Sequence, residues 1–415
     1  MRICLFCLLG TVSAVAQDPV KPVFEAQTID AKIQIGYGLA IGDVDGDGKP
    51  DVILADKTDV VWYANPTWEK HVLATRLTPM DNVCVAARDI DGDGKVEIAV
   101  GAQWNPGETT DETQSGAVFF LNRPEDAKAA WTPVKLAHEP TVHRMKWVKV
   151  GESDFRLIVV PLHGRGNNPQ TGEGEPPKIL AYEPPADRTK AEDWKTAVAD
   201  ATLHKTHNFD VRKARAGSES VWVGGQEGAR ELSFEKGEWS GRTIPQEQLD
   251  KGVGEIRGAG SQILAVIQPM HGHEVAVYHD DFGRTTLDDT LNQGHALLCQ
   301  PLLGGGFPEI VAGWREKNPE GKVGLKMFVR DDNSGKEKWI THVIDDNTMA
   351  CEDLMADDLN ADEKPDLIAS GRATKNVIIY WNKTPFAVKP STERPELPPL
   401  SESEKALIDQ RKEKK

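Results

Sequence analysis

The sequence predicts an all-β fold, namely a seven-bladed β-propeller built from four-stranded antiparallel blades. An acidic loop occurs three times, starting at Asp43, Asp89 and Asp358, so the chain is a repeat protein. Short apolar runs typical of strands flank the loops, as in residues 38–42 before the first copy and 51–55 after it. The spacing of the first two copies is close to the ~40 to 50 residues of one propeller blade, and this period predicts seven blades.

The composition agrees with this fold class and limits the partners. The chain has 415 residues, of which 39% are hydrophobic, with 37 Gly and 26 Pro, as expected of many strands joined by turns. The formal net charge is −16 and no stretch resembles a basic stripe, so nucleic acid and anionic membranes are poor partners. We expect one large propeller over residues 17–387 and a polar, disordered tail over residues 388–415.

Residues 1–16 have the pattern of a signal peptide, with Arg2, an apolar run and a small-residue cleavage site that ends at Ala16. This predicts a secreted or periplasmic protein that is not embedded in a membrane, in a compartment where calcium is abundant. Cys84, Cys299 and Cys351 remain after cleavage and lie in or beside apolar runs. We therefore expect buried thiols rather than a disulfide framework.

The blades can be placed along the chain in order. Residues 23–31 resemble the outer strands expected at 69–73 and 339–344, yet they precede any inner strand. The last blade, residues 352–382, lacks an outer strand, so we expect the N-terminal segment to complete it and close the ring. The other blades are expected at residues 36–75 and 81–139 and from about residues 141, 207, 254 and 295 onward, with loop insertions at 107–115 and 166–177.

The acidic loops are candidate calcium sites. Carboxylates at positions 1, 3, 5 and 9 can surround a hard cation with oxygen ligands, and glycines at positions 4 and 6 permit the positive φ of a tight loop. The third copy has Ala361 and Glu363 at those two positions. The strand-like flanks differ from the helices of an EF-hand. The expected ligands are Asp43, Asp45, Asp47 and Asp51, then Asp89, Asp91, Asp93 and Glu97, then Asp358, Asn360, Asp362 and Asp366.

A second candidate site lies at the mouth of the predicted central channel. The inner strands begin and the second strands end on this face, roughly 15 to 20 Å from the acidic loops at the opposite face. The inner-strand starts are Tyr37, Asn82, His143, His207, Glu255, His295, Glu352 and Asp353, and the second-strand ends contribute Trp104, His163, Arg165, His271, His273, Trp314, Arg315 and Arg372.

The concentration of histidine at this mouth favours an active or binding site over a merely solvated ring, because six of the eleven histidines of the chain fall there. His143, His207 and His295 could bind a second divalent metal from separate blades, with hydrogen bonding to sugar hydroxyls as the alternative. Trp104 and Trp314 could stack on a sugar ring or pack inside the channel. Outer strands are expected to carry His71, His138 and His342, which receive no functional weight.

Two resemblances follow from these motifs. The acidic loops resemble the FG-GAP or VCBS repeat of integrin-type propellers and of many secreted bacterial proteins. Residues 142–147, 161–165, 269–273, 294–297 and 371–376 resemble the propeller portion of the aldos-2-ulose dehydratase family, which eliminates water from keto-sugars such as 1,5-anhydrofructose. The cupin domains of that family are not expected in this chain, so the resemblance implies the dehydration step and not an isomerase step.

The resemblance implies a carbon–oxygen lyase acting on a small-molecule or oligosaccharide substrate. Removing a proton beside a ketone needs a base, and the enolate needs a cation or hydrogen-bond donors. We expect His143, His207 and His295 as metal ligands or base, His163 and His271 as acid or hydroxyl contacts, and Arg315 and Arg372 as enolate partners. Substrate contacts are expected from Trp104, Arg165, His273, Trp314, Glu352 and Asp353.

Two other functions remain open at the level of the sequence. One is a polysaccharide lyase that acts on uronates, and the other is a non-catalytic extracellular scaffold that binds carbohydrate or protein. The sequence has no Gly-x-Ser-x-Gly elbow, no Gly-rich phosphate loop followed by Lys and Ser or Thr, and no His-Glu-x-x-His. A hydrolase with a nucleophilic triad is therefore not expected.

Overall fold

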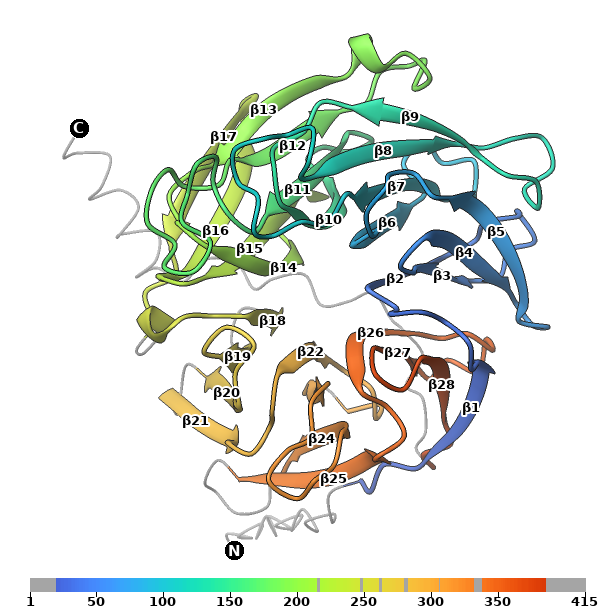
Figure 1. Cartoon of the computed structure of the whole chain (residues 1–415). Helices are drawn as coiled ribbons and strands as arrows, with labels where there is room; N and C mark the ends of the chain where they lie inside the picture. The colour runs from blue at the N-terminus through green and yellow to red at the C-terminus, as the bar shows by residue number, and fades with distance from the viewer. Residues whose placement is uncertain are drawn as a thin grey trace, which may run out of the picture.

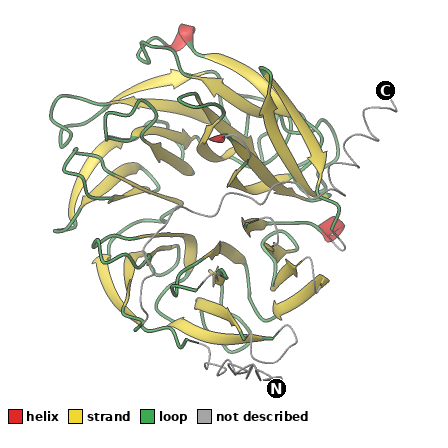
Figure 2. Ribbon diagram, turned by 180° about the vertical axis from the view of Figure 1, so that it is seen from behind, coloured by secondary structure: helices red, strands yellow, loops and turns green. Residues whose placement is uncertain are grey.

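The computed structural model describes residues 20–214, 217–246, 249–260, 263–279, 283–305, 307–331 and 338–385. In this part of the chain, seven four-stranded antiparallel sheets are arranged in a ring (Figures 1 and 2). The described residues contain almost no helix, with short 3₁₀ turns such as Ala191–Asp193 and Leu249–Lys251, and no helix among them is long and apolar enough to span a membrane. The predicted β-propeller is thus confirmed, whereas the expected signal peptide and tail lie outside the described residues.

Six blades follow the chain from inner to outer strand. Blade one contains β2 (Gly38–Gly42), β3 (Asp51–Ala55), β4 (Asp59–Ala64) and β5 (Glu69–Thr75). Blade two contains β6 (Cys84–Arg88), β7 (Glu97–Ala102), β8 (Ala117–Asn122) and β9 (Thr132–Leu136), and blade three contains β10 (Val142–Lys149), β11 (Phe155–Pro161), β12 (Ile179–Glu183) and β13 (Lys195–Asp200). Blade four contains β14 (Thr206–Lys213), β15 (Glu219–Gly225), β16 (Gly228–Glu235) and β17 (Glu238–Thr243). Blade five contains β18 (Glu255–Ala259), β19 (Ile263–Gln268), β20 (Glu274–His279) and β21 (Gly283–Asp288), and blade six contains β22 (Gly294–Gln300), β23 (Glu309–Trp314), β24 (Gly324–Arg330) and β25 (Trp339–Asp346).

The seventh blade combines both ends of the described chain. It contains β26 (Cys351–Asp357), β27 (Asp366–Gly371), β28 (Asn376–Asn382) and, as its outer strand, β1 (Phe24–Asp30) (Figure 1). β1 pairs antiparallel with β28, from Phe24 opposite Asn382 to Asp30 opposite Val377. The N-terminal strand therefore lies where the sequence predicts it, and that it holds the ring closed stays a prediction.

The hydrophobic core is divided among the interfaces between neighbouring blades. The described residues form seven apolar clusters, and each joins two adjacent blades, for example Ile53 with Ile98 and Val52 with Ile368. This follows from sheets stacked face to face, because both faces of the inner strands are covered and their sequences become nearly continuous apolar runs. The outer strands are more polar, as in β5 and β21.

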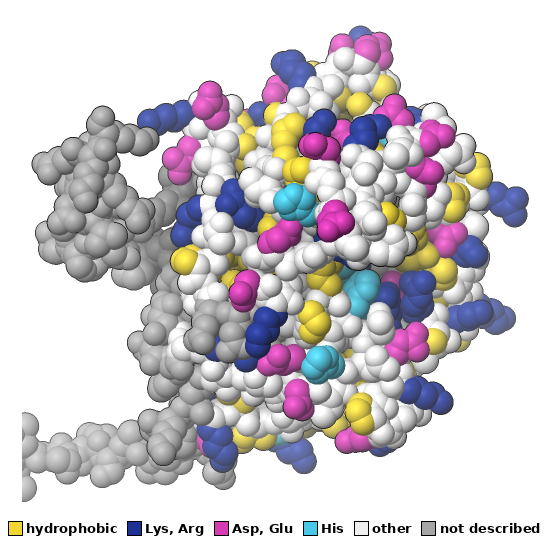
Figure 3. Space-filling model, turned by 60° about the vertical axis from the view of Figure 1, so that its left-hand side comes forward, with side chains coloured by type: hydrophobic (Ala, Val, Ile, Leu, Met, Phe, Trp, Pro, Cys, Tyr) yellow, Lys and Arg dark blue, Asp and Glu magenta, His cyan; other side chains and the backbone are white. Residues whose placement is uncertain are grey.

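The surface in view is mixed in charge, and the cysteines are buried. Acidic and basic side chains are interspersed over the face in Figure 3, with small apolar areas between them. Cys84, Cys299 and Cys351 are free and buried, as the sequence predicts. Burial raises the pKa of all three thiols, so they are protonated and unreactive at neutral pH.

Candidate functional site

Four inner strands begin with a β-bulge, and each bulge contains a predicted site residue. In β10, Val142 lies opposite Pro161 and Arg144 opposite Val160, so His143 is the extra residue. Equivalent register shifts occur at His295 in β22, at Glu352 in β26 and between Thr206 and Phe209 in β14, which contains His207. A bulge redirects a side chain and leaves its backbone groups outside the ladder.

These bulges let successive blades fix the orientation of the imidazoles. The Nδ1 atom of His143 lies 2.9 Å from the carbonyl oxygen of His207, and Nδ1 of His295 lies 2.7 Å from that of Glu352. In the same way, Nδ1 of His207 lies 2.8 Å from the carbonyl oxygen of Gly254. A carbonyl only accepts hydrogen bonds, so each Nδ1 carries the proton and each Nε2 keeps its lone pair. The three rings are therefore held in the tautomer that offers Nε2 to a metal or a proton.

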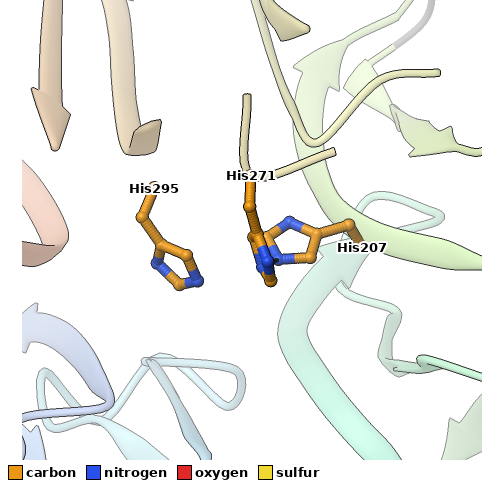
Figure 4. Close-up of side chains that lie close together, drawn as sticks. All are labelled: His207, His271 and His295. Carbon is orange, nitrogen blue, oxygen red and sulfur yellow. Dashed lines mark hydrogen bonds between the residues drawn. The ribbon is translucent and has the colours of Figure 1, made fainter. Parts of the chain in front are cut away.

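His207, His271 and His295 form a compact cluster, called the three-histidine site below (Figure 4). One nitrogen from each ring lies within 4.8 Å of the other two. The ring centroids are 4.4 Å apart for His207 and His271, 5.0 Å for His271 and His295, and 5.2 Å for His207 and His295. His271 lies in the turn after β19 with a φ of 49°, and its Nε2 is 2.5 Å from Nε2 of His207. A positive φ is uncommon for residues with a Cβ atom, although histidine adopts it more readily than most.

The geometry of the cluster is suitable for a divalent transition metal. Three imidazoles with a fourth, open position are a known zinc arrangement, and metal–nitrogen bonds of about 2.0–2.1 Å place tetrahedral ligands roughly 3.4 Å apart. The nitrogen separations here, from 2.5 Å to at most 4.8 Å, bracket that value. The sequence analysis expects His143, His207 and His295 as metal ligands or base, and the cluster that could hold a metal brings His271 together with His207 and His295.

His143 lies beside the three-histidine site rather than in it. Its ring is 4.7 Å from that of His207 and 5.0 Å from that of Trp104, measured between centroids. Trp104 is half-buried and packs against the core between blades two and three. His143 thus keeps an Nε2 lone pair next to the cluster, with an aromatic surface on its other side.

Electrostatics keep these imidazoles neutral. Burial lowers the pKa of His143, His207, His271 and His295, and the charge of Arg144 acts in the same direction on all four. Glu255 opposes this effect at His207, where its carboxylate lies 3.4 Å from Nδ1. Neutral imidazole is the form that binds metals and accepts protons.

A carboxylate and two arginines lie next to His295. The side chain of Glu352, 2% exposed, accepts hydrogen bonds from Arg315 at 2.9 and 3.1 Å and from Arg372 at 2.9 Å. Arg315 also donates to Gln293, and the Arg372 guanidinium lies 5.3 Å from the centroid of Tyr37. The two arginines expected to stabilise an enolate are therefore already paired with Glu352.

Several predicted substrate contacts make their interactions elsewhere. Trp314 is 3% exposed in the core between blades five and six and donates Nε1–H to Lys322, so stacking on a sugar is wrong for this residue and core packing applies. Arg165 pairs with Glu112 and Glu139 in a separate cleft of about 510 Å³, which His138 also lines. His138 follows β9 rather than lying on an outer strand.

Three further predicted residues make their described contacts away from the three-histidine site. His163 is buried, forms an isolated bridge with Lys205, and has a pKa lowered to about 4 by burial. His273 is exposed, and its carbonyl oxygen accepts a hydrogen bond from Leu291. Asp353 accepts backbone N–H groups from Leu39 and Leu354. None of these contacts involves the three-histidine site.

Sequence reasoning missed Arg144, Lys146, Asn208 and Arg257, which also lie on the inner strands. Asn208 donates to both oxygens of Glu255, at 3.0 and 2.8 Å, and Arg257 pairs with the same carboxylate at 3.1 Å. These residues could have been found from one signal, namely polar residues at alternate positions of strands that are otherwise apolar.

The acidic loops lie at the opposite ends of the inner strands, as expected. In the first loop, carboxylate oxygens of Asp43, Asp45 and Asp51 lie within 4.8 Å of one another, and in the second loop so do those of Asp89, Asp91 and Glu97. Burial raises the pKa of Asp51 to about 7 and that of Glu97 to about 6. A bound cation would remove the cost of ionising these buried carboxylates. The remaining predicted ligands, Asp47 and Asp93, instead face Lys49 and Lys95.

The third loop keeps the shape of the other two without their glycines. Ala361 and Glu363 have φ angles of 60° and 64°, where the first loop has Gly46 at 85° and Gly48 at 82°. Asp358 accepts the backbone N–H groups of Asp362 and Glu363, Asn360 accepts that of Asp362, and Asp366 accepts that of Leu359. The loop is thus held by its own carboxylates.

Comparisons with known proteins find the same two relationships. Residues 115–281 match the family described as "Aldos-2-ulose dehydratase, beta-propeller domain", residues 43–100 match "FG-GAP-like repeat", and residues 85–121 match "FG-GAP repeat". The chain is 21% identical over 275 residues to "Aldos-2-ulose dehydratase" of Phanerodontia chrysosporium, an alignment that covers 61% of this chain and 29% of that protein. The chain therefore spans less than a third of this relative's length. The dehydratase match contains His143, His207 and His271, whereas His295 lies beyond its end.

Solved structures share the architecture at low identity. A chain of "Crystal Structure of Mitotic Checkpoint Complex" is 13% identical with a TM-score of 0.51, covering 92% of this chain and 98% of that one. A chain of "Crystal structure of BBS1N in complex with ARL6DN, soaked with mercury" is 13% identical with a TM-score of 0.54, covering 89% and 99%. At such identity the likeness shows the fold alone.

Proposed function

We propose that this protein is a metal-dependent sugar lyase that eliminates water from a keto-sugar of the 1,5-anhydrofructose type. The observation that carries the proposal is the three-histidine site, in which the nitrogens of three neutral imidazoles converge on the face of the propeller where the inner strands begin. The distant relationship to aldos-2-ulose dehydratase supports the reaction class. A divalent metal held by His207, His271 and His295 would act as a Lewis acid on the substrate carbonyl.

The residues of the chain account for the proton transfers. The neutral Nε2 of His143 takes the proton from the carbon beside the carbonyl, the C–H electron pair forms a C=C bond, and the carbonyl oxygen becomes an enolate oxygen. When the C=O bond forms again, the electrons expel the hydroxyl group from the β-carbon, and this group leaves as water with the proton that His143 returns. Because His271 is the partly exposed member of the site, we expect substrate to enter past its ring. Trp104 would supply an aromatic surface beside His143.

The experiment is an ultraviolet assay for a conjugated enone, using zinc-loaded protein with 1,5-anhydrofructose and with 3-keto-glycosides. We expect a rising signal that is lost in His207→Ala and kept in His342→Ala, a matched control on outer strand β25. Absence of signal from the metal-loaded wild type with either substrate class would overturn the proposal. Binding of sugar without turnover would then favour the extracellular scaffold.

We also propose that the first two acidic loops bind calcium as structural sites and that the protein is exported. Supporting observations are the three converging carboxylates in each of these loops and the raised pKa of Asp51 and Glu97. Calorimetric titration of chelator-treated protein tests this, with two sites expected. A protein whose melting temperature and heat signal do not respond to calcium would contradict it.

A further inference from the structure

Among the described residues, four arginines lie around the three-histidine site, and they differ in their partners. Arg315 and Arg372 pair with Glu352, and Arg257 pairs with Glu255. Arg144 has no carboxylate oxygen within 4.0 Å among the described residues. It is the exception in a part of the molecule where every other guanidinium charge is matched.

Arg144 is also buried and short of hydrogen-bond acceptors. Its side chain is 8% exposed, Nη1 donates to the carbonyl oxygen of the adjacent His143 at 3.0 Å, and the buried Nε has no partner among the described residues. A guanidinium has five N–H donors, so most of its capacity is unused. Holding such a charge without a counter-ion is costly and is expected where an anion binds.

The nearest carboxylates are committed to other donors. Asp353, whose pKa Arg144 lowers against the effect of burial, accepts the N–H groups of Leu39 and Leu354. Glu255 accepts from Asn208 and pairs with Arg257. Arg144 therefore interacts with these two charges at longer range and forms no ion pair within 4.0 Å with either.

A contact along β10 places Arg144 with the reacting groups. Its Nη1 donates to the carbonyl oxygen of His143, whose ring centroid lies 4.7 Å from that of His207. Lys146, two residues along β10 on the same face, adds a second cation whose Nζ contacts the Phe209 ring at 5.5 Å and has no carboxylate within 4.0 Å in the described chain.

We propose that Arg144, assisted by Lys146, forms an oxyanion-binding subsite beside the three-histidine site, and that its ligand is an anionic oxygen of the sugar. The inference deepens the proposed function and rests on it for the identity of the sugar. The oxygen has two sources: a carboxylate that the sugar carries before reaction, or the enolate oxygen that forms when the proton is removed. A uronate supplies the first and a neutral keto-sugar supplies the second.

The test compares the wild type with Arg144→Gln, which keeps polarity and removes the charge, and with Arg144→Lys, which keeps the charge. Arg88→Gln is the matched control, because Arg88 also lies on an inner strand but is paired with Glu219. Zinc-loaded proteins are titrated with D-glucuronate and with D-glucose at low ionic strength, and enone formation is measured separately. Zinc content and melting temperature establish that each variant is folded and loaded.

A carboxylate ligand predicts that the wild type and Arg88→Gln bind glucuronate about 10- to 100-fold more tightly than glucose, and that Arg144→Gln loses this preference. An enolate ligand predicts no such preference but a fall in kcat of about 10- to 100-fold in Arg144→Gln, with KM unchanged and partial recovery in Arg144→Lys. Unchanged binding and unchanged kcat in Arg144→Gln would overturn the subsite. Loss of glucuronate binding in a protein without turnover would uphold the subsite and reject the proposed reaction.

Discussion

Position 6 of the acidic loops provides a quantitative test of how the backbone conformation of the loops contributes to stability. Gly94 in the second loop has a φ of 85°, and a Cβ atom added there would meet nothing within 4 Å. Glu363 occupies the same position in the third loop with a φ of 64° and an exposed side chain. A residue with a Cβ atom pays about 1–2 kcal/mol for this left-handed conformation, while glycine costs about 0.4–1 kcal/mol through the greater entropy of the unfolded chain.

The free energy of unfolding should therefore change in opposite directions in two matched variants. Gly94→Ala should lower the free energy of unfolding by about 1 kcal/mol, and Glu363→Gly should raise it by about the same amount. The N–H group of residue 363 still donates to Asp358 after the second substitution, so the backbone contact is kept. Urea unfolding in the presence of a chelator measures both values without a contribution from calcium. A destabilised Glu363→Gly variant, or a neutral Gly94→Ala variant, would refute the reasoning.

Three other predictions concern the ring, the second loop and a buried carboxylate. Deleting residues 20–30 removes β1 and leaves β28 as an open edge, so we expect a lower melting temperature and concentration-dependent association in size-exclusion chromatography; an unchanged profile would show that the ring does not depend on β1. Arg188 lies 2.9 Å from Asp91 and 3.8 Å from Glu97, where its charge would compete with a bound cation. Arg188→Gln should therefore raise the calcium affinity of the second loop about tenfold in calorimetry and leave that of the first loop unchanged. Equal or weaker calcium binding at the second loop would argue against this competition. Burial raises the pKa of Glu309, so this carboxyl group binds a proton more tightly in the folded protein than in the unfolded chain. The free energy of unfolding of the wild type should therefore rise relative to that of Glu309→Gln as the pH falls from the raised pKa toward 4.5. Parallel pH profiles of the two proteins would exclude this contribution.

The fold could be predicted from the sequence because the repeat carries its own markers. Glycines and carboxylates recur at fixed positions of the loops, and each loop separates two apolar runs of strand length. The pairing of β1 with the last blade could be predicted by counting strands, since the last blade has only three strands of its own and would otherwise expose an edge.

The site could be predicted only in part. The starts of the inner strands gave His143, His207 and His295, because equivalent positions of the blades face the same axis. His271 was also predicted at the mouth, but its place in the cluster depends on a turn after β19 and a positive φ, which the sequence does not reveal. The sequence also does not reveal that Arg315 and Arg372 pair with Glu352 while Arg144 lacks such a partner among the described residues. These features depend on contacts between segments that are far apart in the chain. Trp314 shows the limit of residue type alone, since a tryptophan at a strand end was equally suited to stacking and to the core.

Metal stoichiometry at the three-histidine site is the most direct measurement of the central claim. Protein freed of metal is loaded with zinc in the presence of excess calcium, which keeps the acidic loops from contributing, and bound zinc is measured by mass spectrometry of the purified protein. We expect one tightly bound zinc per chain in the wild type and in His163→Ala, a buried histidine whose contacts lie elsewhere. We expect its loss in His207→Ala, His271→Ala and His295→Ala with the ring still folded. A wild type that retains no zinc, or three variants that retain it fully, would contradict the account.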